Sequence, residues 1–107
     1  MILAEEGRHI FKEREEYGFD LIKDSMPEAI EIGVFGSYAR NEHTMLSDID
    51  FYVICDSYPS RDMTSELRDV AEDHNIDIVF MSKNYFDNED TLLIRNIKRD
   101  RRILYER

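Results

Sequence analysis

Apolar residues recur at helical spacing in the first part of the chain. Between residues 2 and 24, one face of a helix would carry Leu3, Ile10, Tyr17 and Leu21, so this segment is predicted to be helical. Pro27 follows and ends the helix, because proline lacks an amide hydrogen and disfavours helical geometry in the residue before it.

Continuous runs of β-branched and aromatic residues predict the strands. The predicted strands are residues 29–35 ("AIEIGVF"), 48–55 ("DIDFYVIC"), 76–81 ("IDIVFM") and a short fourth strand in "RRILYE". The first run breaks at Gly36, and "SYARNE" after it is typical of the first turns of a short helix.

Two amphipathic segments predict further helices. In residues 61–73, Met63, Leu67, Val70 and Ala71 form one apolar stripe, and Ser60 is the predicted N-cap. Residues 84–97 are predicted to be mostly helical, with Tyr85 and Phe86 in the core. The alternation predicts an α/β (α+β) fold in which helices back a small mixed sheet of about four strands, as a single domain over residues 1–107.

Composition narrows the class of protein without naming a function. Among 107 residues, 42% are hydrophobic and 36% charged, which is typical of a folded, charge-rich chain. We expect no membrane span, because no apolar run approaches the required ~20 residues. We also expect no signal peptide, because acidic residues occur within the first five or six positions. The single cysteine, Cys55, is predicted to lie in the core and fits a reducing, cytoplasmic location.

Net charge bears on the partners of the chain. At -10 the protein has no general attraction for nucleic acid, so handling phosphates would need a local reversal of sign, such as a divalent metal. Basic residues gather near the C-terminus, where they form either a solvated face or a contact surface for a nucleotide or acidic partner. They are Arg95, Lys98, Arg99, Arg101, Arg102 and Arg107.

Two acids, Asp48 and Asp50, fall at alternate positions of a predicted strand and therefore on one face. Ionised carboxylates this close repel each other. A shared proton, a solvated position at the strand mouth, or a bound cation would each relieve the repulsion. Magnesium commonly takes one or two carboxylates together with substrate phosphates.

Of these three explanations, other residues of the sequence favour a bound cation. Gly36 and Ser37 stand at a strand-to-helix junction, where backbone without a Cβ can approach a phosphate. Asp77 stands between isoleucines in the third strand, where burial is costly unless the acid is paired or metal-bound. We expect Asp77 to join Asp48 and Asp50 in one cluster.

The stretch "GSYARNEHTMLSDIDF" resembles the signature of DNA polymerase β-type nucleotidyltransferases, and Gly-Ser-x-Ala-Arg with Ser-Asp-x-Asp is closest to the bacterial minimal nucleotidyltransferases. "IDIVF" is similar to the strand with the family's third carboxylate, and the C-terminal "LLIRNIKRDRRILYER" to the family's closing helix and strand. The resemblance implies a polymerase β-type palm. Asn41 stands where the family usually has glycine, and asparagine tolerates a left-handed turn.

The resemblance also implies roles for these residues. Gly36 and Ser37 would hold the β- and γ-phosphates of ATP, and Arg40 would steady either the triphosphate or the short helix. Catalysis and metal binding would fall to three acids, with two Mg2+ ions held between them. Those acids are Asp48, Asp50 and Asp77.

The implied activity is transfer of AMP from ATP to a hydroxyl. Because the chain leaves no residues for a second substrate-binding domain, the resemblance favours a HEPN-type helical toxin as partner, with a toxin tyrosine as acceptor. Two alternatives stay open. One is transfer to a small molecule such as an aminoglycoside, with a homo-oligomer completing the site; the other is a non-catalytic antitoxin that acts by contact.

Neighbouring residues receive lesser roles. His43 is predicted to be solvent-exposed in the loop, and His9 and His74 to be surface residues. Ser47 is predicted to orient Asp48, and Tyr38 to be exposed on the short helix for a nucleotide or partner. Asp56, at the end of the second strand, is kept as a backup ligand.

Overall fold

The computed structural model describes the backbone of residues 5–107 and side chains from residue 10 onward. The predicted helix start at residue 2, Leu3 and the side chain of His9 lie outside the described residues. The elements are α1 (Glu5–Ser25), β1 (Glu31–Phe35), α2 (Gly36–Ala39), β2 (Ile49–Cys55), α3 (Arg61–Glu72), β3 (Ile76–Ser82), α4 (Lys83–Asn88), α5 (Leu92–Asp100) and β4 (Arg102–Glu106).

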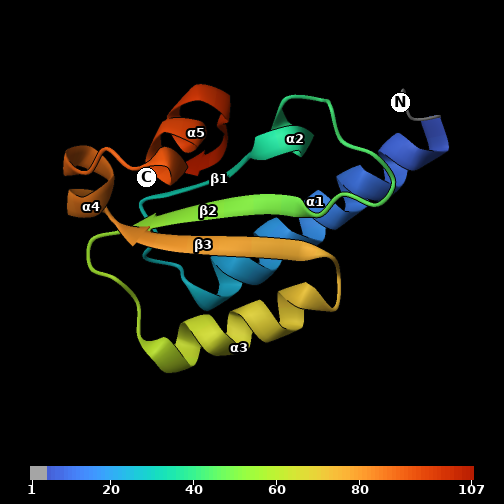
Figure 1. Cartoon of the computed structure of the whole chain (residues 1–107). Coiled ribbons are helices and arrows are strands. Elements are labelled where there is room, and N and C mark those ends of the chain that lie inside the picture. Colours follow the sequence, from blue (N-terminus) through green and yellow to red (C-terminus); the bar gives the residue numbers. More distant parts are fainter. Residues whose placement is uncertain (1–4) are drawn as a thin grey trace.

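The strands form one mixed sheet in the order β3-β2-β1-β4. β1 is antiparallel to both β2 and β4, whereas β2 and β3 are parallel because α3 carries the chain back between them. Helices α1 and α3 lie against one face of the sheet, and α4 and α5 lie on the other side (Figure 1). The predicted α/β class with a small four-stranded mixed sheet is confirmed.

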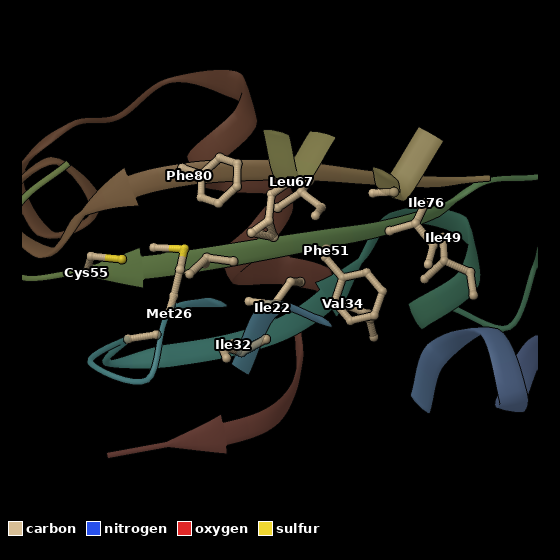
Figure 2. Close-up of a cluster of buried hydrophobic side chains, with 14 of the residues drawn as sticks. Ile22, Met26, Ile32, Val34, Ile49, Phe51, Cys55, Leu67, Ile76 and Phe80 are labelled. Atoms are coloured by element: carbon tan, nitrogen blue, oxygen red, sulfur yellow. The ribbon is translucent and has the colours of Figure 1, made fainter. Parts of the chain in front are cut away.

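The larger core fills the space between the sheet and the helices α1 and α3. Ile22 from α1 and Leu67 from α3 meet Val34, Phe51 and other strand residues that point to this face (Figure 2). A smaller core joins the opposite face to α4 and α5; its buried members are Phe35, Tyr52, Ile54, Met81, Phe86, Ile94 and Ile97. Alternate residues of β2 thus serve two cores.

Helix boundaries follow capping residues. Ser60 caps α3 as predicted, its hydroxyl accepting from the Met63 amide at 3.2 Å. The segment predicted as one helix over residues 84–97 is instead two helices, because Thr91 starts α5 by accepting from the Ile94 amide. Phe86 is buried as predicted, but Tyr85 is 40% exposed, so its predicted core position is wrong.

Strand ends also shift by small amounts. β1 begins at Glu31 rather than residue 29, and β2 begins at Ile49, so Asp48 lies immediately before the strand. None of the helices within residues 5–107 is long and apolar enough to span a bilayer.

Candidate active site

The turn at the end of β1 is built around a glycine for two reasons. Gly36 has φ +74°, a conformation that other residues adopt only with strain. A Cβ at this position would also lie 2.7 Å from Oδ2 of Asp50. The Asp50 carboxylate therefore lies directly against the bare backbone of Gly36.

Strand pairing sets the neighbours of that carboxylate. Asp50 of β2 is the register partner of Phe35 on one side and of Asp77 on the other. Directly paired residues point to the same face, so Asp50 and Asp77 both face the side that α4 and α5 partly cover. Gly36 at the end of β1, Asp50 of β2 and Asp77 of β3 thus form a row across this edge of the sheet.

The carboxylates differ in exposure. Asp50 is half-buried, while Asp48 and Asp77 are exposed. The expectation that Asp77 is buried between its isoleucines is wrong, because alternation turns Ile76 and Ile78 into the core and Asp77 away from it. In this protein, solvation at the strand mouth relieves two of the three acids.

Asp50 is the carboxylate whose ionised form is destabilised by its surroundings. Burial, and then the negative charges of Asp77 and Asp48, raise the pKa of Asp50 to about 6. Both acids thus act on Asp50 from nearby positions. A cation beside Asp50 would stabilise the ionised carboxylate and so lower this pKa.

The donor set suits magnesium only together with a phosphate ligand. Among the side chains that the structure describes, from residue 10 onward, no three of His, Cys, Asp or Glu are grouped closely enough to hold a metal ion by themselves. Magnesium, however, typically takes one or two carboxylates and completes its shell with substrate phosphates and water. Asp50, with Asp48 and Asp77 beside it, supplies hard oxygen donors of this kind.

The loop between α2 and β2 is ordered by its own hydrogen bonds. Ser47 accepts from the Thr44 amide at 2.9 Å and its own amide donates to the Thr44 carbonyl at 3.0 Å, so these bonds of Ser47 shape the turn. Asn41 adopts φ +62°, which confirms that asparagine can form the left-handed turn here. Asp56 lies at the opposite end of β2 and pairs with Arg107, away from the cluster.

The predictions for His43 and Tyr38 are wrong. His43 is only 7% exposed, packs edge-on against Phe11 and Tyr38, and has no hydrogen-bond partner at either ring nitrogen. Burial lowers the pKa of His43. Tyr38 is half-buried and stacks on Phe11. These rings border a cavity of about 330 Å³ that includes none of the carboxylates.

Arg40 lies at the far end of α2 from Gly36. Its guanidinium donates to Oδ2 of Asp100 at 2.6 Å and to Glu42 at 3.0 Å. Of the two predicted roles, steadying the triphosphate or steadying the short helix, these contacts concern the helix.

The family described as nucleotidyltransferase domain matches residues 19–104. The chain belongs to this family. The predicted resemblance is therefore confirmed, and the Gly-Ser turn and all three aspartates of the nucleotidyltransferase lie inside the matched range. No curated protein sequence matches the chain closely.

Solved structures share the fold of this nucleotidyltransferase. A tri-AMPylated Shewanella oneidensis HEPN toxin in complex with MNT antitoxin matches at TM-score 0.63 and 20% identity, over 90% of this chain and 72% of that chain. A toxin–antitoxin with AMP-PNP matches at TM-score 0.63 and 22% identity, over 83% and 70%. A mutant of the MntA–HpeT toxin–antitoxin matches at TM-score 0.63 and 20% identity, over 87% and 73%.

One contact of the nucleotidyltransferase escaped sequence reasoning. Asp100 stands among basic residues in "KRDRR", and the positive charge of that stretch gives no sign that its one acid has a structural role. The guanidinium of Arg40, which donates to the Asp100 carboxylate, is 60 residues away in sequence, so only the fold could reveal the pair.

Proposed function

We propose that this protein is a magnesium-dependent nucleotidyltransferase that transfers AMP from ATP to a hydroxyl group, at a tyrosine of a HEPN-type partner protein. One observation carries the proposal: Asp50 of β2 lies between Gly36, directly after β1, and Asp77 of β3. This supports a phosphate-binding role for the glycine turn, which lies beside two carboxylates. Family membership supports the reaction type.

Each residue has a task in this reaction. The backbone of Gly36 and Ser37 would hold the β- and γ-phosphates, because Gly36 has no side chain of its own to keep a phosphate away. Asp48 and Asp50 would hold magnesium, with Asp77 as an additional ligand. Bound magnesium supplies positive charge that offsets the phosphate oxygens and the departing pyrophosphate.

Transfer makes one bond and breaks one. The acceptor oxygen bonds to the α-phosphorus as the bond from that phosphorus to the pyrophosphate oxygen breaks, and the hydroxyl proton leaves. Asp77 is exposed and adjacent to Asp50. It is therefore the carboxylate best placed to accept that proton from an incoming hydroxyl.

The partner class comes from the structural neighbours. One of them contains a HEPN toxin that carries AMP groups, and another was solved with AMP-PNP. The exposed, solvated position of Asp77 suits an acceptor on a second macromolecule, since the site is open on this side.

Intact-mass measurement tests the proposal. The purified protein, incubated with a HEPN-type toxin, ATP and magnesium, should give a toxin heavier by one or more AMP groups, and peptide mapping should place them on tyrosine. Asp50→Asn should lower the rate by at least about 100-fold, because the metal loses its central ligand. Asp56→Asn, at the other end of β2, is the matched control and should react normally.

Other outcomes separate the alternatives. A partner of unchanged mass that is nonetheless inhibited, equally by wild type and Asp50→Asn, would mean action by contact. AMP found only on a small-molecule hydroxyl would replace the acceptor and keep the chemistry.

A further inference from the structure

Helix α2 is held at its far end by an ion pair to α5. Nη1 of Arg40 lies 2.6 Å from Oδ2 of Asp100. The Asp100 side chain is only 2% exposed, and Arg99 donates to it at 2.7 Å from Nε and 3.0 Å from Nη2. One shielded carboxylate therefore joins the two helices.

Asp100 is poorly placed for its own helix. It is the last residue of α5, where the negative end of the helix dipole disfavours an acid. Its location is instead explained by its partners: hydrogen bonding from Arg99, and then from Arg40, holds the pKa of Asp100 down to about 2. The carboxylate is therefore charged throughout the physiological range.

The two helices differ in how firmly they are anchored. Ile94 and Ile97 bury α5 in the smaller core, and Thr91 caps its start. None of the four residues of α2 is fully buried, only Tyr38 and Ala39 pack partly against the larger core, and no side chain caps its start. Contacts at its ends therefore matter more for the position of α2 than for that of a packed helix.

We propose that Asp100 is a positioning residue, which holds α2 through Arg40 so that Gly36 and Ser37 stay aligned with Asp50. This inference rests on the proposed function. Asp100 touches neither nucleotide nor acceptor in this arrangement. Its effect reaches the phosphates only through the short helix, four residues long, that separates Arg40 from β1.

Calorimetry with magnesium and AMP-PNP gives the main test. Asp100→Asn keeps the shape of the side chain but removes its charge, and should weaken binding about tenfold. Asp100→Glu keeps the charge and should restore most of the affinity. Arg99→Ala is the matched control: it removes contacts to the same carboxylate but leaves the bridge to α2, and should bind within about twofold of wild type.

Amide hydrogen exchange gives a readout that needs no nucleotide. Residues 36–40 should exchange faster in Asp100→Asn than in Arg99→Ala, while the amides of β2 should exchange alike. Thermal denaturation of both variants sets a common temperature at which each is folded, so lost stability is not mistaken for lost positioning.

The outcomes distinguish the two proposals. Wild type that binds AMP-PNP, together with an Asp100→Asn variant that binds equally well, overturns the positioning role and leaves the proposed function intact. Wild type that binds no AMP-PNP with magnesium overturns both. Equal exchange of residues 36–40 in the two variants overturns the claim that Asp100 holds α2.

Discussion

Asp50 occupies the most confined position of the three acids. Gly36 lies against its carboxylate, Asp77 of β3 is its register partner, and Asp48 lies two residues before it in sequence. Without a cation the cost falls on the ionised form, which is why its pKa rises to about 6. The geometry that prepares this site for a metal therefore works against stability when no metal is bound.

Asp50→Asn should stabilise the metal-free protein at neutral pH. A folded pKa near 6 against 3.8 means that the folded state holds the proton more tightly, so stability falls as pH rises from about 4 to 6. The amide avoids that loss. After allowance for solvent screening, we expect a gain of about 1–2 kcal/mol near pH 7.5 that vanishes near pH 4.

Urea denaturation in chelator-treated buffer at both pH values measures this difference. Asp56→Asn, an exposed acid at the other end of β2, should change stability by less than about 0.5 kcal/mol. An Asp50→Asn variant less stable than wild type at neutral pH would show that the carboxylate is held by favourable contacts instead.

At the scale of elements, a buried acid ties the sheet together. Glu31 of β1 is 7% exposed, and its Oε2 accepts from the Tyr52 hydroxyl of β2 at 2.6 Å and from Arg101, just before β4, at 2.7 Å. Burial, and then the Glu31 carboxylate, raise the pKa of Tyr52. One carboxylate thus links three neighbouring strands.

Tyr52→Phe should destabilise the protein by about 1–3 kcal/mol, because Glu31 loses one of its two donors while it stays buried. Urea denaturation near neutral pH measures the loss. Tyr105→Phe on β4 is the control; its ring faces the Lys23 ammonium, and this contact survives the change. If Tyr52→Phe were as stable as wild type, the hydrogen bond from Arg101 alone would be enough to offset the burial of the Glu31 carboxylate.

Local pattern and long-range contact explain which elements sequence could predict. Strands β2 and β3 follow from their apolar runs, and α3 follows from its stripe and Ser60 cap. The break before α5 depends on Thr91, which is ordinary in sequence but becomes a cap once Ile94 is buried. His43 is polar in a polar loop, and its burial is explained by packing against Phe11 of α1 and Tyr38 of α2.

The site shows the same division. Glycine at position 36 and acids at 48, 50 and 77 were predicted as a set from spacing and resemblance. The pairing of Asp50 with Asp77 between the parallel strands β2 and β3 could be known only from the order of the strands in the sheet. The same holds for the exposure of Asp77. Asp100 was missed because charge patterning along "KRDRR" carries no information about a partner 60 residues away.

Across the whole molecule, the basic C-terminal region largely neutralises acids of the same chain. This supports the solvated-face interpretation over a free contact surface for a phosphate. The ion pairs are Arg95–Asp90, Arg99–Asp100, Arg101–Glu31, Arg102–Glu15 and Arg107–Asp56. With the net charge at -10, a triphosphate meets an unfavourable field unless magnesium accompanies it.

Thermal denaturation should therefore show that nucleotide stabilises the protein only when magnesium is present. At about 100 times its dissociation constant, AMP-PNP with magnesium should add about 2.7 kcal/mol, or on the order of 10 °C in Tm for a chain of this size. AMP-PNP with EDTA should give little or no shift, because the phosphates then face Asp48, Asp50 and Asp77 without a cation between them.

Magnesium alone separates the two contributions. It should raise the Tm of wild type by a smaller amount, by relieving Asp50, and should leave Asp50→Asn unchanged, because that variant has lost the charge that the metal relieves. A shift with AMP-PNP that is as large in EDTA as in magnesium would mean that the phosphates are held by cationic side chains. In that case the acids would lie outside the nucleotide site, and the proposed roles of Gly36, Asp50 and Asp77 in binding phosphate and metal would be wrong.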